Sequence, residues 1–386
     1  MIKPLNVLFS YVEKKAGSAT VRCKPWKISL EVALSCNLRC ITCRHGLEQF
    51  GGIMTQETFE RVKPILAWAR VVNEVGYGEP LLDPHFLDKL RYAKRLRAAV
   101  FAYSNGMLLT PERCEQLVAL GLDQLTFSVD GGTPQTLQSI RVGADYRRIL
   151  DNIRLLHQAK LRRRSKKPYL RANFVGMRRN IEELPRAVQT LAEAGIQEVI
   201  LSDMMPLSAE LAREHLSLFP QVARAAVAEA RNVARRYRIG FSAPRDFPSA
   251  AAPLFPDEPA EHNRRIDSAH RPAPADSYRR CPCYEPWQTI CVTHDGHVQP
   301  CCAIARSFGN LFEQDIETIW NGPLYRALRQ SVNGPEPAFP ECRQCLLRQR
   351  VRLPLRTLLA MGAHSLLHGG VARTARAAMR YVTEYA

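Results

Sequence analysis

Six short hydrophobic runs alternate with amphipathic stretches over residues 26–204. The runs are rich in β-branched and aromatic residues, as is typical of buried strands, and cover residues 26–34, 71–75, 98–104, 122–130, 169–175 and 197–204. Apolar residues recur at helical spacing in residues 55–70, 83–96, 110–121, 146–160 and 180–195. Strands that alternate with helices form a parallel sheet with helical crossovers. The pattern therefore predicts an α/β fold built as a partial (β/α)6 barrel.

Residues with a preference for helix ends mark two of these helices. Thr55 can act as the N-cap of the 55–70 helix, and Glu57 places a negative charge in its first turn, where the helix dipole favours it. Thr110, Pro111 and Gly121 supply a cap, a first-turn proline and a stop for the 110–121 helix. These signals agree with the hydrophobic periodicity.

The alternation of strands and helices ends near residue 205. Residues 211–240 are alanine-rich and indicate one or two further helices, whereas proline and alanine without periodicity indicate a linker or lid after residue 245. Residues 290–302 have the form of a β-hairpin with Asp295–Gly296 as its turn. The predicted domains are an N-terminal extension (1–25), the core (26–245), the linker or lid (246–280), a small cysteine-rich α+β domain (281–350) and a basic amphipathic helical tail (351–386).

The chain of 386 residues has a formal net charge of +17, part of which lies in residues 160–167. No aromatic residues interleave this basic run as a stacking surface would require, so nucleic acid is not expected as a partner. The 351–386 tail could lie on an anionic membrane, but docking on the protein or on a partner subunit is favoured. No apolar run reaches the roughly 18–20 residues of a membrane span. The N-terminus lacks a secretory cleavage site, so we expect a cytoplasmic protein.

The cysteines, twelve in all, fall mainly into clusters, which in a reducing compartment favours metal binding over disulfides. Cys36, Cys40 and Cys43 directly follow the first predicted strand. Three thiolates are one short of a closed tetrahedral zinc site, for which the nearby His45 is an alternative fourth ligand. Barrel enzymes gather functional groups at the carboxyl ends of their strands. Polar or glycine-bearing segments end the next three strands on the same rim, at residues 76–80, 104–106 and 128–132.

The spacing Cys-x3-Cys-x2-Cys, followed by Gly78, Glu79 and Pro80 after the second strand, resembles the radical S-adenosylmethionine (SAM) superfamily over residues 26–205. The resemblance implies a TIM-like partial barrel in which Cys36, Cys40 and Cys43 bind three irons of a [4Fe–4S] cluster and leave the fourth iron to SAM. It also implies reductive cleavage of SAM to a 5′-deoxyadenosyl radical, hydrogen abstraction from a substrate, and a reducing partner such as flavodoxin or ferredoxin.

The same resemblance assigns residues to SAM. The expected contacts are Gly78 and Glu79 with the ammonium group, Ser128 and Asp130 with the ribose side, Arg141 with the carboxylate, and Ser104, Asn105 and Asn173 as further cofactor contacts. Two positions depart from the family pattern. Thr42 stands where an aromatic residue often lies against the adenine, and Tyr77 separates the paired glycines.

A second cysteine set follows the linker. Cys283 is followed by twelve residues, Gly296, four residues and Cys301, and Cys342 and Cys345 have Cys-x2-Cys spacing. Four such thiolates fit either an iron–sulfur cluster or zinc. The segment resembles the SPASM and twitch extensions of radical SAM enzymes, and the absence of cysteine after Cys345 matches the shorter twitch type. That resemblance implies one auxiliary [4Fe–4S] cluster on these four cysteines. Cys281 and Cys302 are alternative ligands, and ordinary buried thiols are expected at Cys23, Cys114 and Cys291.

The two predicted clusters indicate a reaction. A fully ligated auxiliary cluster has no vacant site for SAM, so it would take an electron from the substrate radical in a two-electron oxidation. Redox-neutral epimerisation and deoxygenation are the alternative reactions. Asp203, at the end of the sixth strand, is the candidate base. Only about 25 residues precede the first strand, so we expect an oxidoreductase of a small biosynthetic molecule, such as a sugar or aminocyclitol. The alternatives are a maturase of a ribosomally made peptide or protein, and a non-catalytic metal-binding or electron-transfer protein.

Overall fold

A ten-stranded sheet runs through the described part of the chain, which comprises residues 3–48, 50–244, 279–280, 282–343, 345 and 349–350 of this computed structural model. The strand order is β13-β12-β11-β1-β3-β4-β5-β7-β8-β9, and every pairing from β11 to β9 is parallel. The strands are β1 (Lys27–Leu30), β3 (Val71–Glu74), β4 (Ala99–Ser104), β5 (Gln124–Ser128), β7 (Tyr169–Gly176), β8 (Glu198–Asp203), β9 (Gly240–Ser242), β11 (Thr289–Val292), β12 (His297–Gln299) and β13 (Gly309–Asn310). Two smaller sheets pair β2 (Arg39–Cys40) with β6 (Arg141–Val142) and β10 (Arg279–Arg280) with β14 (Gln349–Arg350).

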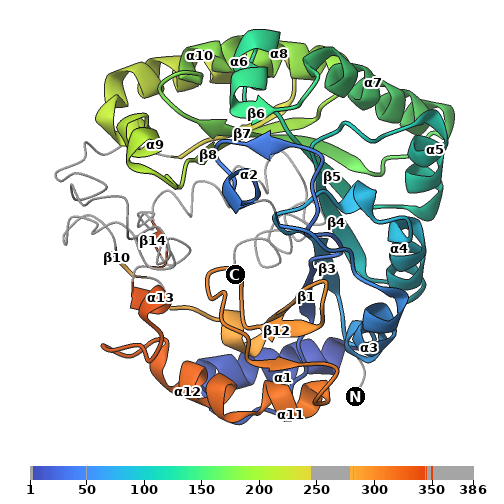
Figure 1. Ribbon diagram of the computed structural model, residues 1–386, viewed down its shortest axis with the longest axis vertical. Helices are drawn as coiled ribbons and strands as arrows, with labels where there is room; N and C mark the ends of the chain where they lie inside the picture. Colours follow the sequence, from blue (N-terminus) through green and yellow to red (C-terminus); the bar gives the residue numbers. More distant parts are fainter. Residues whose placement is uncertain are drawn as a thin grey trace, which may run out of the picture.

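The strands predicted from the six hydrophobic runs all form, as β1, β3, β4, β5, β7 and β8, and they are parallel neighbours. The predicted α/β fold is therefore confirmed. The sheet is curved and open, because β13 and β9 form its two edges, and it does not close into a cylinder (Figure 1). The short strand β9 extends the sheet beyond β8. This strand has only three residues, which are too few to give a recognisable strand pattern in the sequence.

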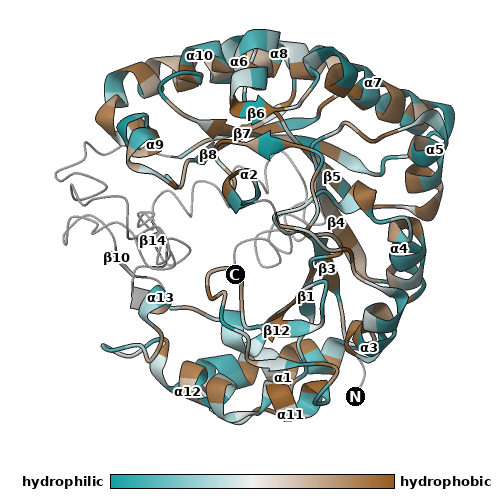
Figure 2. Cartoon of the chain, viewed as in Figure 1, coloured by the Kyte–Doolittle hydropathy of each residue, from teal (hydrophilic) through white to brown (hydrophobic). Residues whose placement is uncertain are grey.

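Helices cover the outer side of the curved sheet (Figure 1). As predicted, Thr55 and Thr110 accept hydrogen bonds from the N–H groups of Thr58 and Arg113, and Gly121 ends α5 in the left-handed conformation. Hydrophobic and hydrophilic residues alternate around these helices (Figure 2), as expected for amphipathic helices packed on a sheet. The helices are α1 (Lys3–Ala16), α2 (Arg44–Glu48), α3 (Gln56–Leu66), α4 (Phe86–Arg95), α5 (Pro111–Leu120), α6 (Pro134–Ile140), α7 (Tyr146–Arg162), α8 (Leu184–Ala194), α9 (Ala209–Arg213), α10 (Pro220–Tyr237), α11 (Ile316–Trp320), α12 (Pro323–Ser331) and α13 (Pro340–Arg343).

The two faces of the sheet differ in polarity. Ile28, Phe127 and Phe174 are fully buried and belong to the main hydrophobic core beneath the helices. Because successive side chains of a strand point to opposite faces, their neighbours Ser29 and Asn173 lie on the other face, where they are only partly buried. The outer face therefore supplies the core, and the inner face leaves polar side chains accessible to a ligand.

The C-terminal hairpin continues the same sheet. The predicted hairpin forms from β11 and β12, and Gly296 takes a positive φ of 87° in its turn. β11 pairs in parallel with β1, so that Thr289 lies opposite Lys27 and Val292 lies opposite Leu30. The hairpin thus lies beside the strand that leads into the first cysteine loop.

The N-terminal segment packs against this C-terminal region. Ser10 Oγ donates to the carbonyl oxygen of Trp287 at 2.8 Å, and Trp287 Nε1 donates to the carbonyl oxygen of Ser18 at 2.9 Å. Trp320 Nε1 donates to the carbonyl oxygen of Cys23 at 2.8 Å. Both indoles are buried, so these hydrogen bonds satisfy polar groups that water does not reach. They connect the two ends of the described chain.

Several predictions concern residues that the structure does not describe. Most of the 246–280 linker, Cys281 and the 351–386 tail lie outside the described residues. The predicted domain boundaries therefore stay predictions. None of the described helices has the length and apolar character needed to cross a membrane.

Candidate active site

The first cysteine cluster lies in the loop after β1. The pairing of β2 with β6 places Cys40 opposite Arg141 and brings Arg141 Nη1 to 3.7 Å from the Cys40 Sγ. Cys40 is buried, whereas Cys36 and Cys43 are half-buried. Burial raises the pKa of Cys40 to about 11, and the Arg141 guanidinium acts in the opposite direction. The loop thus presents three thiols beside one cation.

The turn after β3 packs its backbone against the cysteine loop. A Cβ atom at Gly78 would lie 2.2 Å from the carbonyl oxygen of Ala33, so only glycine fits this position. The Glu79 N–H donates to the carbonyl oxygen of Ser35 at 2.9 Å. The carbonyl oxygen of Tyr77 lies 3.9 Å from the Sγ of Cys43. These contacts fix the predicted Gly-Glu-Pro segment beside the cysteines.

The Glu79 side chain holds the ends of neighbouring strands together. It is buried, and its carboxylate accepts hydrogen bonds from the Leu81 N–H at 3.1 Å, the Ser104 hydroxyl at 2.9 Å and the Asn105 N–H at 2.7 Å. Burial raises the pKa of Glu79, and these hydrogen bonds oppose the shift. Both carboxylate oxygens are thus engaged by the chain itself. The expected contact of Glu79 with the SAM ammonium group stays a prediction.

Asn105 extends this hydrogen-bonded network to the cysteine loop. Its Nδ2 donates to Asn37 Oδ1 at 2.8 Å and lies 4.0 Å from the Cys36 Sγ. Its Oδ1 accepts a hydrogen bond from the Met107 N–H at 2.9 Å. Ser104 and Asn105, which were expected to contact the cofactor, therefore connect β4 to the turn after β3 and to the loop that carries Cys36.

Asp130 holds Arg141 in place. Its Oδ2 lies 2.7 Å from Arg141 Nη2, and its Oδ1 accepts a hydrogen bond from the Val175 N–H at 2.8 Å. Burial acts against the charge on Arg141, but Asp130 and the Cys40 thiol raise the pKa of the guanidinium above its usual value. Arg141 Nε is buried without a hydrogen-bond partner among the described residues, so it has a donor left for an anionic ligand. The ribose contact of Asp130 stays a prediction.

Two further expected contacts lie side by side on adjacent strands. Ser128 of β5 and Asn173 of β7 are register partners, and both are half-buried. Asn173 Oδ1 accepts a hydrogen bond of 2.5 Å from the Ser202 hydroxyl of β8. The structure therefore brings these polar side chains together at the carboxyl ends of three neighbouring strands.

Asp203 has a histidine partner that the sequence pattern does not reveal. His215 Nε2 lies 3.1 Å from Asp203 Oδ1, and the Ser217 N–H donates to His215 Nδ1 at 3.2 Å. Since Nδ1 accepts a hydrogen bond, the ring proton of the neutral imidazole lies on Nε2 and can be donated to Asp203. The histidine is buried, whereas 44% of the Asp203 side chain is exposed. This partner orients the candidate base.

The second cysteine set is assembled from separate segments. The Cys283 N–H donates to Asn333 Oδ1 at 2.7 Å, and Asn333 Nδ2 donates to the Cys283 carbonyl oxygen at 3.0 Å. Burial raises the pKa of the Cys283 thiol to about 12, with a contribution from the nearby thiols of Cys345 and Cys342. Burial also raises the pKa of Cys301, to which Cys283 contributes as well. Cys283 therefore lies near each of the other three predicted ligands.

The remaining described cysteines differ in their exposure to solvent. Cys23 and Cys114 are buried, as predicted, whereas Cys291 is half-buried. Cys302 is exposed and lies near Cys345, whose thiol contributes to the raised pKa of Cys302. Cys302 therefore stays an alternative ligand to Cys301.

The donors fit iron–sulfur clusters better than a single metal ion. In the described part of the chain, no three His, Cys, Asp or Glu side chains converge on a point that could hold one ion. The alternative zinc site with His45 as a ligand is therefore not formed by these residues. A cluster makes a different demand, because each thiolate binds its own iron. Three thiols beside a buried cation, with a glycine turn packed against them, fit a cluster that leaves one iron to an anionic ligand.

A cavity of about 250 Å³ separates the two cysteine regions, and sequence analysis does not find it. Glu31, Tyr77, Gln299 and Cys302 are among its lining residues. Glu31 lies 3.3 Å from His294 of the hairpin, so two segments remote in sequence meet at this point. The one local signal is that Ser29 and Glu31 alternate with buried apolar residues on and just after β1, which places both on the inner face.

Comparison with known proteins finds two family regions and relatives of different coverage. Residues 30–191 match the Radical SAM superfamily, and residues 281–346 match the iron–sulfur cluster-binding domain SPASM. The tungsten-containing aldehyde ferredoxin oxidoreductase cofactor-modifying protein of Pyrococcus furiosus is 28% identical over 189 residues, which cover 47% of this chain and 52% of that protein. The chain thus spans about half the length of this relative. The PqqA peptide cyclase of Streptomyces rochei is 27% identical over 335 residues, which cover 83% of this chain and 81% of that protein.

A solved structure shares the fold. SuiB of Streptococcus suis, bound to the precursor peptide SuiA, has a TM-score of 0.59 and 14% identity, and the match covers 84% of this chain and 71% of that chain. Residues 30–191 therefore carry a radical SAM region, and residues 281–346 carry a C-terminal SPASM domain. This family implies a SAM-binding [4Fe–4S] cluster, and the SPASM domain implies auxiliary cluster binding.

Proposed function

We propose that this enzyme uses SAM to form a radical on a peptide or protein and thereby modifies one of its residues. The observation that carries the proposal is the similarity to the PqqA peptide cyclase, which covers 83% of this chain and 81% of that protein. The expectation of a sugar or aminocyclitol substrate depended on the short segment before the first strand. The relatives described above give it no support, and we propose the peptide alternative in its place.

In this proposal the residues of the first site bind and orient the cofactors. Cys36, Cys40 and Cys43 would hold a [4Fe–4S] cluster, which together with SAM would supply the radical chemistry for hydrogen abstraction from the substrate. Arg141, charged and held by Asp130, is proposed to bind the SAM carboxylate. Further contacts to SAM are proposed for Gly78, through the close approach of its backbone, and for Ser128 and Asn173.

Other residues shape the rim of the site. Glu79 fixes the relative positions of the turn after β3 and the end of β4, and Asn105 connects that end to the Cys36 loop. Asp203, oriented by His215, is proposed to accept a proton from the substrate. We assign an auxiliary [4Fe–4S] cluster to Cys283, Cys301, Cys342 and Cys345. A separate reducing protein is proposed as the electron donor.

Deuterium transfer tests both the radical chemistry and the substrate class. Cells of the source organism are grown on deuterated amino acids, and their extract is separated by dialysis into a retained peptide and protein fraction and a small-molecule fraction. Each fraction is incubated anaerobically with the reconstituted enzyme, SAM and dithionite. Mass spectrometry of the 5′-deoxyadenosine then shows whether it carries a deuterium atom taken from the substrate.

The proposal expects deuterium in 5′-deoxyadenosine only with the retained fraction, and expects its loss after that fraction is digested with a protease. Deuterium transfer from the small-molecule fraction alone would contradict the peptide assignment but leave the radical chemistry intact. Absence of any 5′-deoxyadenosine from an enzyme with full iron content would contradict both.

A further inference from the structure

The cavity between the two cysteine regions has one wall beside each of them. Tyr77 lines it on one side, and the carbonyl oxygen of this residue lies 3.9 Å from the Sγ of Cys43. Gln299 and Cys302 line it on the other side, and the Cys302 thiol lies near enough to Cys301 to contribute to the raised pKa of Cys301. A group that enters the cavity therefore lies between the residues assigned to the two clusters.

The lining combines apolar walls with one carboxylate. Val75, Val292 and the half-exposed ring of Tyr77 supply the apolar surface. Ser29 supplies a hydroxyl, and Glu31 is the one carboxylate among the described lining residues, with no lysine or arginine among them. Such a lining suits an apolar group that ends in a hydrogen-bond donor.

Glu31 is held in place by the hairpin through its ion pair with His294. His294 Nδ1 lies 3.3 Å from Glu31 Oε1, and the side chains are 18% and 14% exposed. Glu31 chiefly accounts for the raised pKa of His294. This hydrogen bond engages Oε1, so Oε2 can accept a hydrogen bond from a ligand.

Two glycines make room for this pair. A Cβ atom at Gly76 would lie 2.6 Å from Glu31 Cγ and 2.8 Å from Glu31 Oε2. A Cβ atom at Gly52 would lie 2.2 Å from His294 Nε2. All three separations are below 3.0 Å, which real Cβ atoms essentially never show. The chain therefore approaches the pair closely from two sides, which restricts the rotamers that either side chain can adopt.

We propose that this cavity receives the side chain of the residue that is modified, and that Glu31, positioned by His294, accepts a hydrogen bond from a donor at its end. The proposal rests on the proposed function, because it places a peptide side chain there. The ligand class is an apolar side chain with a donor-bearing tip, either a phenol or an alkylammonium group. Glu31 would contact the substrate, and His294 would act as a positioning residue.

Matched probes separate the donor from the apolar body. N-acetyl-tyrosinamide is compared with N-acetyl-phenylalaninamide, and N-acetyl-lysinamide with N-acetyl-norleucinamide, so that each pair differs only at the tip. Binding to the anaerobically reconstituted enzyme in the presence of SAM is measured by ligand-observed NMR. A hydrogen bond to a carboxylate is worth about tenfold in affinity, so we expect at least one donor probe to bind about tenfold more tightly than its partner.

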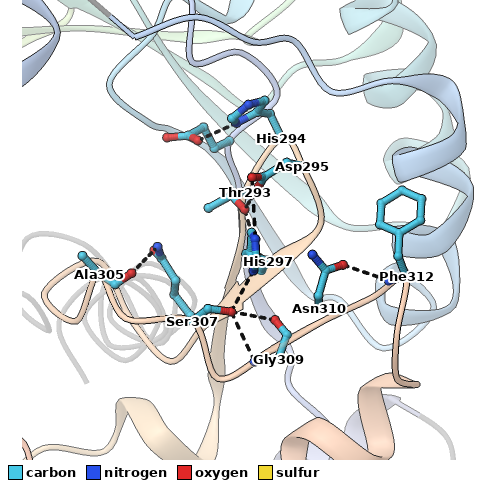
Figure 3. Close-up of polar contacts among 11 residues, drawn as sticks. Thr293, His294, Asp295, His297, Ala305, Ser307, Gly309, Asn310 and Phe312 are labelled. Carbon is cyan, nitrogen blue, oxygen red and sulfur yellow. Dashed lines mark hydrogen bonds and ion pairs between the residues drawn. The ribbon is translucent and has the colours of Figure 1, made fainter. Parts of the chain in front are cut away.

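Two variants of the ion pair and two controls near it test the residues. Glu31→Gln and His294→Gln should reduce the preference for the donor probe. His297→Gln and Asn310→Ala should leave it unchanged, because His297 contacts Ser307, and Asn310 contacts the Phe312 N–H (Figure 3). SAM cleavage without substrate and iron content are measured for every variant, to show that it is folded and loaded.

The outcomes are distinct. Equal binding within both probe pairs by the wild type, binding of no probe at all, or an unchanged preference in Glu31→Gln would each overturn the assignment of this cavity. If the control variants lost the preference as much as the Glu31 and His294 variants, the effect would belong to the hairpin fold and the proposal would fail. Loss of SAM cleavage by the wild type would instead refute the proposed function.

Discussion

The two cysteine regions of this molecule are built in different ways. Cys36, Cys40 and Cys43 lie in one loop, and the pairing of β2 with β6 places a charged arginine 3.7 Å from one of their sulfurs. The cysteines of the second region come from the hairpin and the segments before and after it. Burial chiefly raises the pKa values of the Cys283 and Cys301 thiols, with smaller contributions from neighbouring thiols.

This difference indicates different tasks. The first region combines three thiols with a cation and a glycine turn, which leaves room and charge for a second, anionic ligand. The second region places three further thiols near Cys283, and four thiolates would occupy every iron of a cluster. The first arrangement suits chemistry on a bound molecule, whereas the second suits holding a closed cluster.

Removal of a first-region cysteine should have the largest effect. The variant Cys40→Ser loses one of three ligands and is expected to lose about half of the iron and all detectable SAM cleavage, since the cluster that binds SAM cannot form. Anaerobic reconstitution, iron and sulfide analysis and quantification of 5′-deoxyadenosine measure this. The matched control Cys114→Ser alters a thiol buried in α5 and should keep the iron content. Retained cleavage in Cys40→Ser would contradict the ligand assignment.

Loss of second-region ligands should separate the two tasks. In Cys283→Ala/Cys342→Ala about half of the iron should again be lost, because the auxiliary cluster cannot form, but substrate-free SAM cleavage should persist. Modification of the peptide substrate should be lost. Iron analysis and cleavage assays on one sample measure the separation.

An equal loss of SAM cleavage in this double variant and in Cys40→Ser would break the distinction between the two regions. Cys302→Ala serves as the comparison within the second region. If it lost the auxiliary iron while Cys301→Ala kept it, the fourth ligand would be Cys302 in place of Cys301.

The ion pair beside the first region should have an intermediate effect. Asp130→Asn leaves Arg141 in place but removes the charge that orients it, and substitutions of such supporting residues cost about 10–100-fold in activity. We expect slower SAM cleavage at unchanged iron content, measured at saturating and at limiting SAM. Asp151→Asn, which alters an exposed ion pair with Arg154, should change neither rate. A loss of iron in Asp130→Asn would assign the pair to cluster binding.

The same contrast explains what the sequence could predict. The cysteine triad, the Gly-Glu-Pro turn, the caps Thr55 and Thr110 and the turn of the hairpin are local patterns, and the structure contains each of them where it was expected. The six strands were predictable because each packs one face against the helices, which requires apolar, β-branched or aromatic residues within a short segment.

Features made by distant segments were not predictable in this way. β1 pairs with β11, although the two strands are far apart in sequence and no local pattern encodes which parallel strand lies next to which. Asp203 was chosen for its place at the end of β8, but its partner His215 follows in an irregular segment. Glu31 and His294 meet only because the hairpin joins β1.

The strand before the Gly-Glu-Pro turn carries the last predicted effect, which is on stability and not on activity. Glu74, the last residue of β3, is fully buried with neither carboxylate oxygen hydrogen-bonded to a described residue, and Asp83 instead pairs with Lys89 at 2.8 Å. Burial, with a contribution from Asp83, raises the pKa of Glu74 from 4.5 to about 8. Between these values the folded protein binds a proton that the unfolded chain releases. The free energy of unfolding should therefore fall as the pH rises, by up to about 1.4 kcal/mol per pH unit.

Glu74→Gln should remove this dependence, because the amide stays neutral at every pH. The urea midpoint of the reconstituted protein, followed from mildly acidic to mildly alkaline pH, should then decline less steeply than in the wild type. Glu60→Gln is the matched control, since Glu60 lies exposed on α3, where Lys63 and Gln56 lower its pKa. Parallel pH profiles for the wild type and Glu74→Gln would show that Glu74 is ionised in the fold. A buried charge without a hydrogen-bond partner among the described residues would then lie beneath the turn that packs against the first cysteines. That charge would lower the stability of the fold around the first region and not around the second.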